Sequence, residues 1–164
     1  MTRYKLVIEY EGTCFVGWQR QTNGPSVQEA LEASVKGFCG ETAIVYGAGR
    51  TDAGVHATGQ VAHVDIVCGT NENTVRDAIN AHLRPLPVAV LSAEEVSEKF
   101  HARFSAEERA YRYHILNRRT PPAIYRDQVW HVPKNLDVDA MASAATVLQG
   151  KHDFTTFRAR QCQA

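Results

Sequence analysis

The order of strand-like and helix-like segments in the first 91 residues constrains the fold of this chain most. Four segments rich in β-branched and aromatic residues predict strands, at residues 4–10, 42–46, 61–66 and 88–91. Helical spacing of apolar residues predicts helices over 26–40 and 74–83. The resulting order is typical of the split βαβ or ferredoxin-like fold, an α+β fold whose antiparallel sheet carries helices on one face.

The two predicted helices also carry recognisable end signals. Ser26 and Glu29 have the spacing of a capping box, and Gly40 follows the last apolar position of that helix. Pro85 stops the second helix soon after Leu83, because proline cannot continue a helical hydrogen-bond ladder. These signals place both helices between predicted strands.

The remaining residues predict the start of a second α/β unit. Strands are expected over 109–117 and 129–132, and a helix over 137–148, with Asp137 as its N-cap. We therefore expect a ferredoxin-like domain at residues 1–100, and the beginning of an incomplete second domain at residues 101–164.

Charge is distributed unevenly along the chain. The whole sequence has 18 basic and 18 acidic side chains, which lacks the basic excess expected of a nucleic-acid binder. Residues 1–100 hold 8 basic and 12 acidic side chains, whereas residues 101–164 hold 10 and 6. Six arginines fall between residues 101 and 126: Arg103, Arg109, Arg112, Arg118, Arg119 and Arg126. Arginine favours bidentate phosphate contacts and stacking, although a solvated charged face is the alternative interpretation.

Cysteine usage and the N-terminal sequence bear on compartment and metal content. The cysteines are isolated from one another and lack zinc-type spacing, at Cys14, Cys39, Cys68 and Cys162. Glu9 interrupts the apolar run near the N-terminus, and no run elsewhere approaches membrane length. We expect a cytoplasmic protein with reduced thiols and no metal.

The segment 47–56 (Gly-Ala-Gly-Arg-Thr-Asp-Ala-Gly-Val-His) is the best candidate for a functional site. It lacks the Gly-Lys-Ser/Thr of a P-loop and the third glycine of a dinucleotide fingerprint, so no cofactor is expected. A carboxylate at a glycine-flanked turn lets a planar ligand approach closely, and Arg50 could hold Asp52 ionised as a nucleophile or base. The alternative is that Asp52 forms the turn and Arg50 is its surface partner.

Aromatic and basic residues elsewhere suggest RNA contacts. Tyr111 and Tyr113, flanked by Arg109 and Arg112, fit base stacking and phosphate binding, or else two aromatic residues of a sheet core. A polar loop at residues 17–21 presents Trp18 and Arg20, and we expect the tryptophan to be exposed. Three histidines on different elements are expected to be structural: His56, His63 and His101.

Taken together, these segments resemble the bacterial tRNA pseudouridine synthase A family. The matching segments, in the family's order, are Gly17 to Gln21, Ser26 to Glu29, Gly49 to Ala57, Phe100 to Ala106 with Arg109 and Tyr111 to Tyr113, and His152 to Thr155 with Phe157 and Arg158. The resemblance implies a pseudouridine synthase-like fold and isomerisation of uridine at positions 38–40 of the tRNA anticodon stem-loop, without a cofactor, by a homodimer. By resemblance, Asp52 is the catalytic aspartate, Arg50 its basic partner and Tyr111 the residue that packs on the target uracil.

Further expectations concern RNA contacts and the extent of the chain. RNA contacts are expected from Trp18, Arg20, Arg103, Arg109, Arg112 and Arg118. Family members continue beyond the Phe-Thr-Thr-Phe-Arg segment, so we expect a fragment that lacks part of the base pocket and has little or no activity by itself. Two other functions remain open: a non-catalytic RNA-binding module of the same fold, and a small-molecule hydrolase built on Asp52 and His56.

Overall fold

The computed structural model describes residues 1–68 and 70–157. Its contacts divide the chain into two compact units, Met1–Arg112 and the residues from Tyr113 onward. Residues 101–112, which the sequence assigns to a second domain, thus belong to the first unit. Two residues named from the sequence, Arg158 and Cys162, lie outside the described residues.

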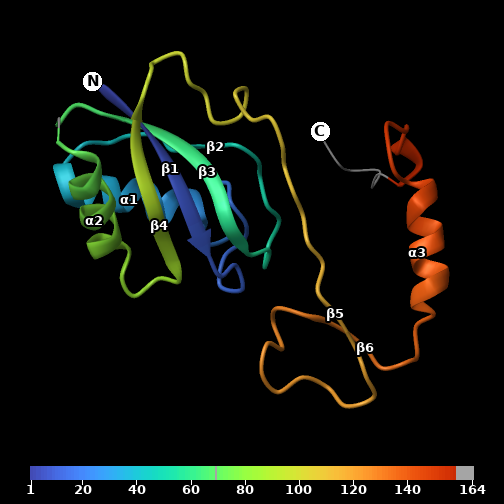
Figure 1. Ribbon diagram of the computed structural model, residues 1–164. Coiled ribbons are helices and arrows are strands. Elements are labelled where there is room, and N and C mark those ends of the chain that lie inside the picture. Colours follow the sequence, from blue (N-terminus) through green and yellow to red (C-terminus); the bar gives the residue numbers. More distant parts are fainter. Residues whose placement is uncertain (69, 158–164) are drawn as a thin grey trace. The chain divides into compact units, whose positions relative to one another are not determined.

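The first unit is a four-stranded antiparallel sheet with two helices on one side (Figure 1). In chain order its elements are β1 (Thr2–Tyr10), α1 (Val27–Cys39), β2 (Tyr46–Gly47), β3 (Ala57–Ile66), α2 (Glu72–Leu83) and β4 (Val88–Val96). The strand order is β2-β3-β1-β4, and every neighbouring pair is antiparallel. The predicted α+β, ferredoxin-like arrangement is therefore confirmed.

The core of this unit lies between the sheet and the helices. Alternate residues of β1, from Tyr4 to Tyr10, are buried, because successive side chains of a strand point to opposite faces. Leu31 of α1 and Ile79 of α2 are fully buried in the same cluster. A slip of one residue in β1 would expose its whole apolar set, so this alternation fixes the strand register.

The helix caps explain where the helices begin and end. The Ser26 side chain accepts a hydrogen bond from the backbone N–H of Glu29 (3.2 Å), and Gly40 ends α1 in the left-handed conformation (φ 75°). Both predicted ends of α1 are confirmed. Helix α2 begins before Thr74 because Asn71 caps it, accepting a hydrogen bond from the Thr74 N–H (2.9 Å).

The shortness of β2 is the main departure from the predicted strands. A strand was expected over 42–46, but only Tyr46–Gly47 pairs with β3. Side chains of α1 hold the preceding backbone instead. Glu32 accepts a hydrogen bond from the Val45 N–H (3.1 Å), and Gln28 donates one to the Val45 carbonyl (3.2 Å). By contrast, β3 and β4 are longer than predicted.

The opposite face of the sheet is covered in part by the segment that follows β4. Arg3 forms an ion pair with Asp65 (2.7 Å) and donates a hydrogen bond to the Phe100 carbonyl (2.7 Å). His63 is buried on this face and accepts the Ala102 N–H (3.1 Å). Burial, assisted by the charge of Arg3, lowers the pKa of His63 from 6.5 to about 4. The segment is thereby fastened across the sheet.

The second unit contains little regular structure. Strands β5 (Ile115–Asn117) and β6 (Trp130–Val132) pair in parallel, followed by α3 (Val138–Val147) and a short 3-10 turn (Thr155–Phe157). The strand predicted over 109–117 is thus wrong for all but its last three residues. None of the described residues from 113 to 157 is buried, so this part lacks the packed core that makes the first unit stable.

Among the described helices, none has the length and apolar character needed to cross a membrane.

Candidate active site

The glycine-rich loop 47–56 connects β2 to β3 and is held at several points along its backbone. Ala48 N–H donates to the Val61 carbonyl (2.7 Å), and the Gln60 side chain donates to the Gly49 carbonyl (2.7 Å). The hydroxyls of Tyr10 and Thr51 are hydrogen-bonded (2.8 Å), and burial raises the pKa of Tyr10. The loop is therefore positioned by β1 and β3 before any ligand binds.

The segment following β1 packs against the same loop through two glycines. Gly17 has a φ of 120°, and a Cβ there would lie 2.5 Å from the Thr51 carbonyl oxygen. A Cβ on Gly12 would lie 2.0 Å from the carbonyl oxygen of Val55. Both approaches are too close for any other residue, so these glycines let the two backbones meet.

Trp18 is part of this packing, and the expectation that it is exposed is wrong. Its side chain is only 3% exposed, and its ring centroid lies 6.1 Å from that of Tyr10. The indole fits inward because Gly47 leaves space, since a Cβ on that residue would lie 2.5 Å from the ring. The backbone N–H of Trp18 also donates to the Thr51 carbonyl (3.0 Å). Trp18 therefore supports the loop and presents no free surface to RNA.

Asp52 and Arg50 lie on the exposed part of the loop. Asp52 begins a tight turn in which Val55 N–H donates to the Asp52 carbonyl (3.2 Å) and Gly54 adopts a φ of 77°. Both the Asp52 and Arg50 side chains are exposed. Within the described residues they form no ion pair with one another, so the expected Arg50–Asp52 pairing is not present in this structure. The carboxylate of Asp52 is open to a ligand.

Arg109 contacts the loop directly. Its Nε and Nη2 atoms lie 3.1 and 3.0 Å from the Ala48 carbonyl oxygen, and Nη2 also donates to the Arg103 carbonyl (2.9 Å). The sequence suggests Arg109 as a phosphate contact, but the structure uses its guanidinium to hold backbone. This role could not be recognised from local sequence, since the partner lies 61 residues away.

Tyr111 lies beside the same loop, although not on a strand. Its hydroxyl is 3.9 Å from the position that a Cβ of Gly49 would occupy, and its side chain is 68% exposed. The predicted strand face shared by Tyr111 and Tyr113 is absent, because this stretch has no ladder partner among the described residues. Tyr111 nevertheless places an accessible aromatic ring close to the loop that carries Asp52.

An aromatic cluster holds the segment that leads to Arg109. The Tyr46 ring stacks on His63 (5.0 Å between centroids), His63 contacts His101 (4.7 Å), and His101 contacts Phe104 (4.5 Å). His63 thus has the structural role expected from the sequence, and so does His56, whose Nδ1 accepts the Gly12 N–H (3.0 Å).

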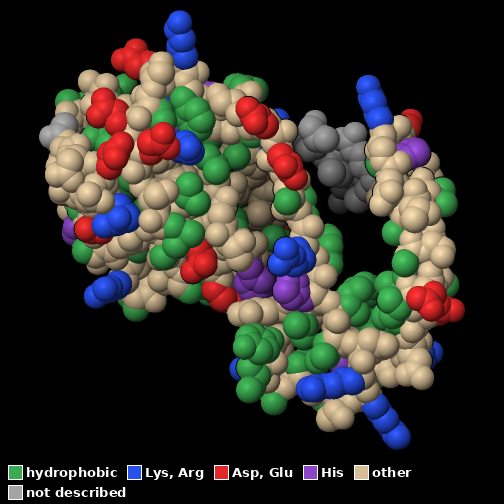
Figure 2. All heavy atoms as spheres, viewed as in Figure 1, with side chains coloured by type: hydrophobic (Ala, Val, Ile, Leu, Met, Phe, Trp, Pro, Cys, Tyr) green, Lys and Arg blue, Asp and Glu red, His purple; other side chains and the backbone are tan. Residues whose placement is uncertain are grey.

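The other arginines expected to contact RNA differ in their surroundings. Arg20 forms an ion pair with Glu32 (2.6 Å), and Arg118, in the second unit, donates to a carbonyl two residues further on (2.9 Å). Arg103 and Arg112 are exposed. On the face of the first unit seen in Figure 2, basic and acidic side chains are interspersed, and basic ones do not form a single patch.

This combination of fold and loop agrees with the comparison to known families. The family model for tRNA pseudouridine synthases matches residues 6–105, which is more than half of the chain. The matched region contains the sheet from Leu6 of β1 onward and the loop with Asp52. The chain belongs to the tRNA pseudouridine synthase family, a family of isomerases.

Individual relatives extend the similarity over all 164 residues. The chain is 62% identical to tRNA pseudouridine synthase A of Parvibaculum lavamentivorans, covering 100% of this chain and 67% of the relative. It is 62% identical to the protein of that name from Rhodopseudomonas palustris, again covering 67% of the relative. The corresponding protein of Methylobacterium radiotolerans is 61% identical, with 65% of its length covered. The chain thus spans about two thirds of the length of these relatives.

Proposed function

We propose that this chain carries the catalytic aspartate of a tRNA pseudouridine synthase that isomerises uridine to pseudouridine in the anticodon stem-loop. The observation that carries the proposal is the Asp52 carboxylate. It is exposed on a loop whose backbone is fixed by contacts from β1, β3, the segment 12–18 and Arg109. Family membership supplies the reaction class, and the loop supplies a group able to perform it.

The reaction requires a nucleophile and no change of oxidation state. The bond between ribose C1′ and uracil N1 breaks, the base turns, and C1′ joins C5. N1 gains a proton and C5 loses one, so atoms and charge balance without a cofactor. An ionised carboxylate can assist by adding to the uracil ring or by trapping the ribose at C1′. Either route needs Asp52 to be held still while the base turns.

The surroundings of Asp52 suit a nucleotide that has left its stack. Extruding a base costs a few kcal/mol, which stacking on an aromatic side chain can offset. Tyr111 is exposed beside the loop, and we assign it to stacking on the target uracil. Arg50, also exposed on the loop, is assigned to contact the nucleotide or the ionised Asp52 once RNA is bound.

Binding of the tRNA backbone is assigned to the exposed arginines. Arg103 and Arg112 are open to solvent, while Arg20 and Arg118 would exchange their present partners for phosphate. Arg109 and Trp18 are assigned to supporting the loop. By family resemblance we also propose that the protein acts in the cytoplasm as a homodimer and that the reaction uses no metal.

Release of tritium from tRNA labelled at uracil C5 tests the proposal, because that proton is lost only when C5 forms its new bond. In an active polypeptide that contains residues 1–164, Asp52→Asn should abolish release while tRNA affinity stays within a few-fold of the parent. Asp77→Asn, which changes an exposed aspartate on α2, is the matched control and should release tritium normally.

The same assay distinguishes the proposed enzyme from a non-catalytic RNA-binding module. A non-catalytic RNA-binding module would bind tRNA but release no tritium in any polypeptide that contains residues 1–164. Release that persists in Asp52→Asn would show that another group is the nucleophile.

A further inference from the structure

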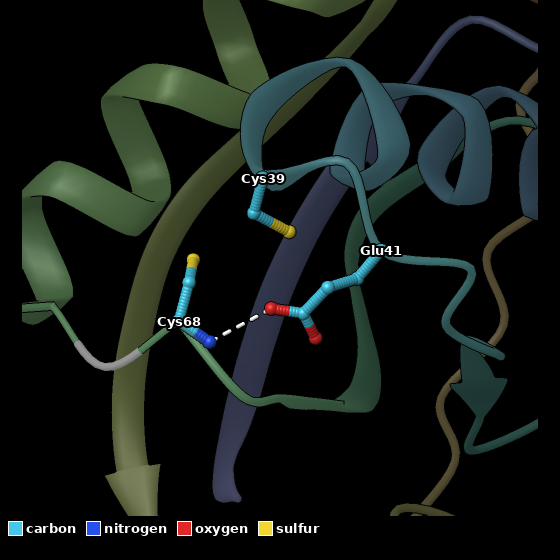
Figure 3. Close-up of side chains that lie close together, drawn as sticks. All are labelled: Cys39, Glu41 and Cys68. Atoms are coloured by element: carbon cyan, nitrogen blue, oxygen red, sulfur yellow. Dashed lines mark hydrogen bonds between the residues drawn. The ribbon is translucent and has the colours of Figure 1, made fainter.

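At one edge of the first unit, Cys68 meets two residues that are distant from it in sequence, Cys39 and Glu41. Cys39 is the last residue of α1, Glu41 follows two residues later, and Cys68 lies just beyond the end of β3. Their two sulfur atoms and a carboxylate oxygen all lie within 4.8 Å of one another. Figure 3 shows the three side chains converging from the α1 end and the β3 end.

The carboxylate in this cluster is held in place by backbone. The Glu41 Oε2 accepts the Val67 N–H (2.8 Å), and Oε1 accepts the Cys68 N–H (2.7 Å), as drawn in part in Figure 3. Each oxygen keeps a further lone pair for another partner. Among the residues that the structure describes, no Lys or Arg forms an ion pair with Glu41. An ionised acceptor is therefore fixed beside two thiols without a basic side chain to balance it.

The donor set defines which ligand would fit. Cysteine sulfur and carboxylate oxygen are common zinc ligands, and thiolates favour Zn²⁺ over hard cations such as Mg²⁺ and Ca²⁺. Zinc lies about 2.3 Å from sulfur and about 2.0–2.2 Å from a carboxylate oxygen, so sites of this kind are compact. The three ligand atoms already lie within 4.8 Å of one another, so the cluster is compact enough to be compared with such a site.

We propose that Cys39, Glu41 and Cys68 bind one thiophilic divalent cation of the zinc type, with water as the fourth ligand. Binding releases the two thiol protons and changes no oxidation state. The site lies beyond the end of β3, at Ile66, whereas the loop carrying Asp52 precedes the start of β3 at Ala57. The cation would therefore join the end of α1 to the end of β3 and would not take part in the chemistry at Asp52.

The sequence predicts no metal because its potential ligands are not closely spaced along the chain. Cys39 and Cys68 come from different elements, and only the pairing of β1 with β3, together with the packing of α1 on the sheet, brings them together. The inference is independent of the proposed function, since it concerns binding at a separate place in the fold.

Titration of the full chain with Co²⁺ under a non-thiol reductant tests the proposal. We expect sulfur-to-cobalt charge-transfer absorption that saturates at one ion per chain and is abolished by added Zn²⁺. Cys39→Ser and Cys68→Ser should each weaken binding at least tenfold, and Glu41→Gln should weaken it less. Cys14→Ser, which changes an exposed cysteine outside the cluster, is the matched control and should bind as the parent does.

Three outcomes would overturn the proposal. The first is the absence of charge-transfer absorption in a parent chain whose circular dichroism shows that it is folded. The second is absorption that survives in both cysteine variants. The third is a reduced chain that binds no Co²⁺ but loses two hydrogens by intact mass after treatment with glutathione disulfide. That result would make the pair a thiol–disulfide couple instead.

Discussion

Acidification should destabilise the first unit through one buried histidine. His63 is 1% exposed beneath the segment 100–105, and burial lowers its pKa from 6.5 to about 4. Unfolding exposes the imidazole and restores its ordinary pKa. Between these two values the unfolded chain therefore binds more protons than the native one, and stability falls as pH falls.

The size of the effect follows from the two pKa values. Below both pKa values, the free energy of unfolding is lowered by about 3 kcal/mol in total. Lowering the pH from 7 to 5 should already lower it by about 2 kcal/mol. Asp65, whose pKa the Arg3 guanidinium lowers, remains ionised in the native state at pH 5. The loss between pH 7 and 5 is thus assigned to His63.

Denaturant unfolding followed by the fluorescence of Trp18 measures this loss. Trp18 is buried in the first unit, and Trp130→Phe removes the other tryptophan, which is 65% exposed. In that background, His63→Gln keeps an acceptor for the Ala102 N–H and should flatten the pH dependence. His82→Gln changes an exposed histidine on α2 and should leave the dependence unchanged.

The reasoning would be refuted by a parent chain whose unfolding free energy is constant between pH 7 and 5. It would also be refuted by a folded His63→Gln variant that retains the full loss. A lower stability of that variant at pH 7, with a flat profile below, agrees with the expectation.

Three further predictions concern the loop and its surroundings. Gly47→Ala should lower the unfolding free energy by about 1–3 kcal/mol, measured by urea denaturation, because the new Cβ meets the Trp18 ring at 2.5 Å. Arg109→Met should lower tritium release on the order of a hundredfold while the protein stays folded, because the Ala48 carbonyl loses its anchor and the loop shifts. Binding of anticodon arms should weaken steeply with salt, and Arg112→Gln should reduce the slope of log affinity against log salt by about 1. A salt-independent affinity would contradict the last prediction.

The first unit was predictable because its elements carry local signals. The Ser26 cap, the Gly40 stop and the alternation of β1 each appear within a few neighbouring residues, and the order of elements then selects the fold. The strand expected over 42–46 is mostly wrong because side chains of α1 form hydrogen bonds with the backbone of Val45. Strand propensity carries no information about such side-chain partners. The strand expected over 109–117 failed likewise, since alternating tyrosines do not supply a pairing partner.

The candidate site was predictable only in part. Local composition singled out the loop and Asp52, but the residues that hold the loop come from far along the chain. The polar neighbours of Trp18 predict an exposed side chain that contacts RNA. The space left by Gly47 explains why the side chain is buried instead. The sequence likewise predicts a phosphate contact for the guanidinium of Arg109, which binds backbone in the structure.

The contacts of Ala102 with His63 and of Arg109 with the Ala48 carbonyl also have a consequence for the order of events during synthesis. Ribosomes release the N-terminus first, so β1 and the loop of Asp52 emerge well before Ala102 and Arg109. Until Arg109 leaves the exit tunnel, the Ala48 carbonyl lacks its partner and Tyr111 has not reached the loop. A nascent chain shorter than this would carry Asp52 on a loop that lacks its contact to Arg109. The surroundings of Asp52 are therefore completed only by residues that are translated well after Asp52 itself.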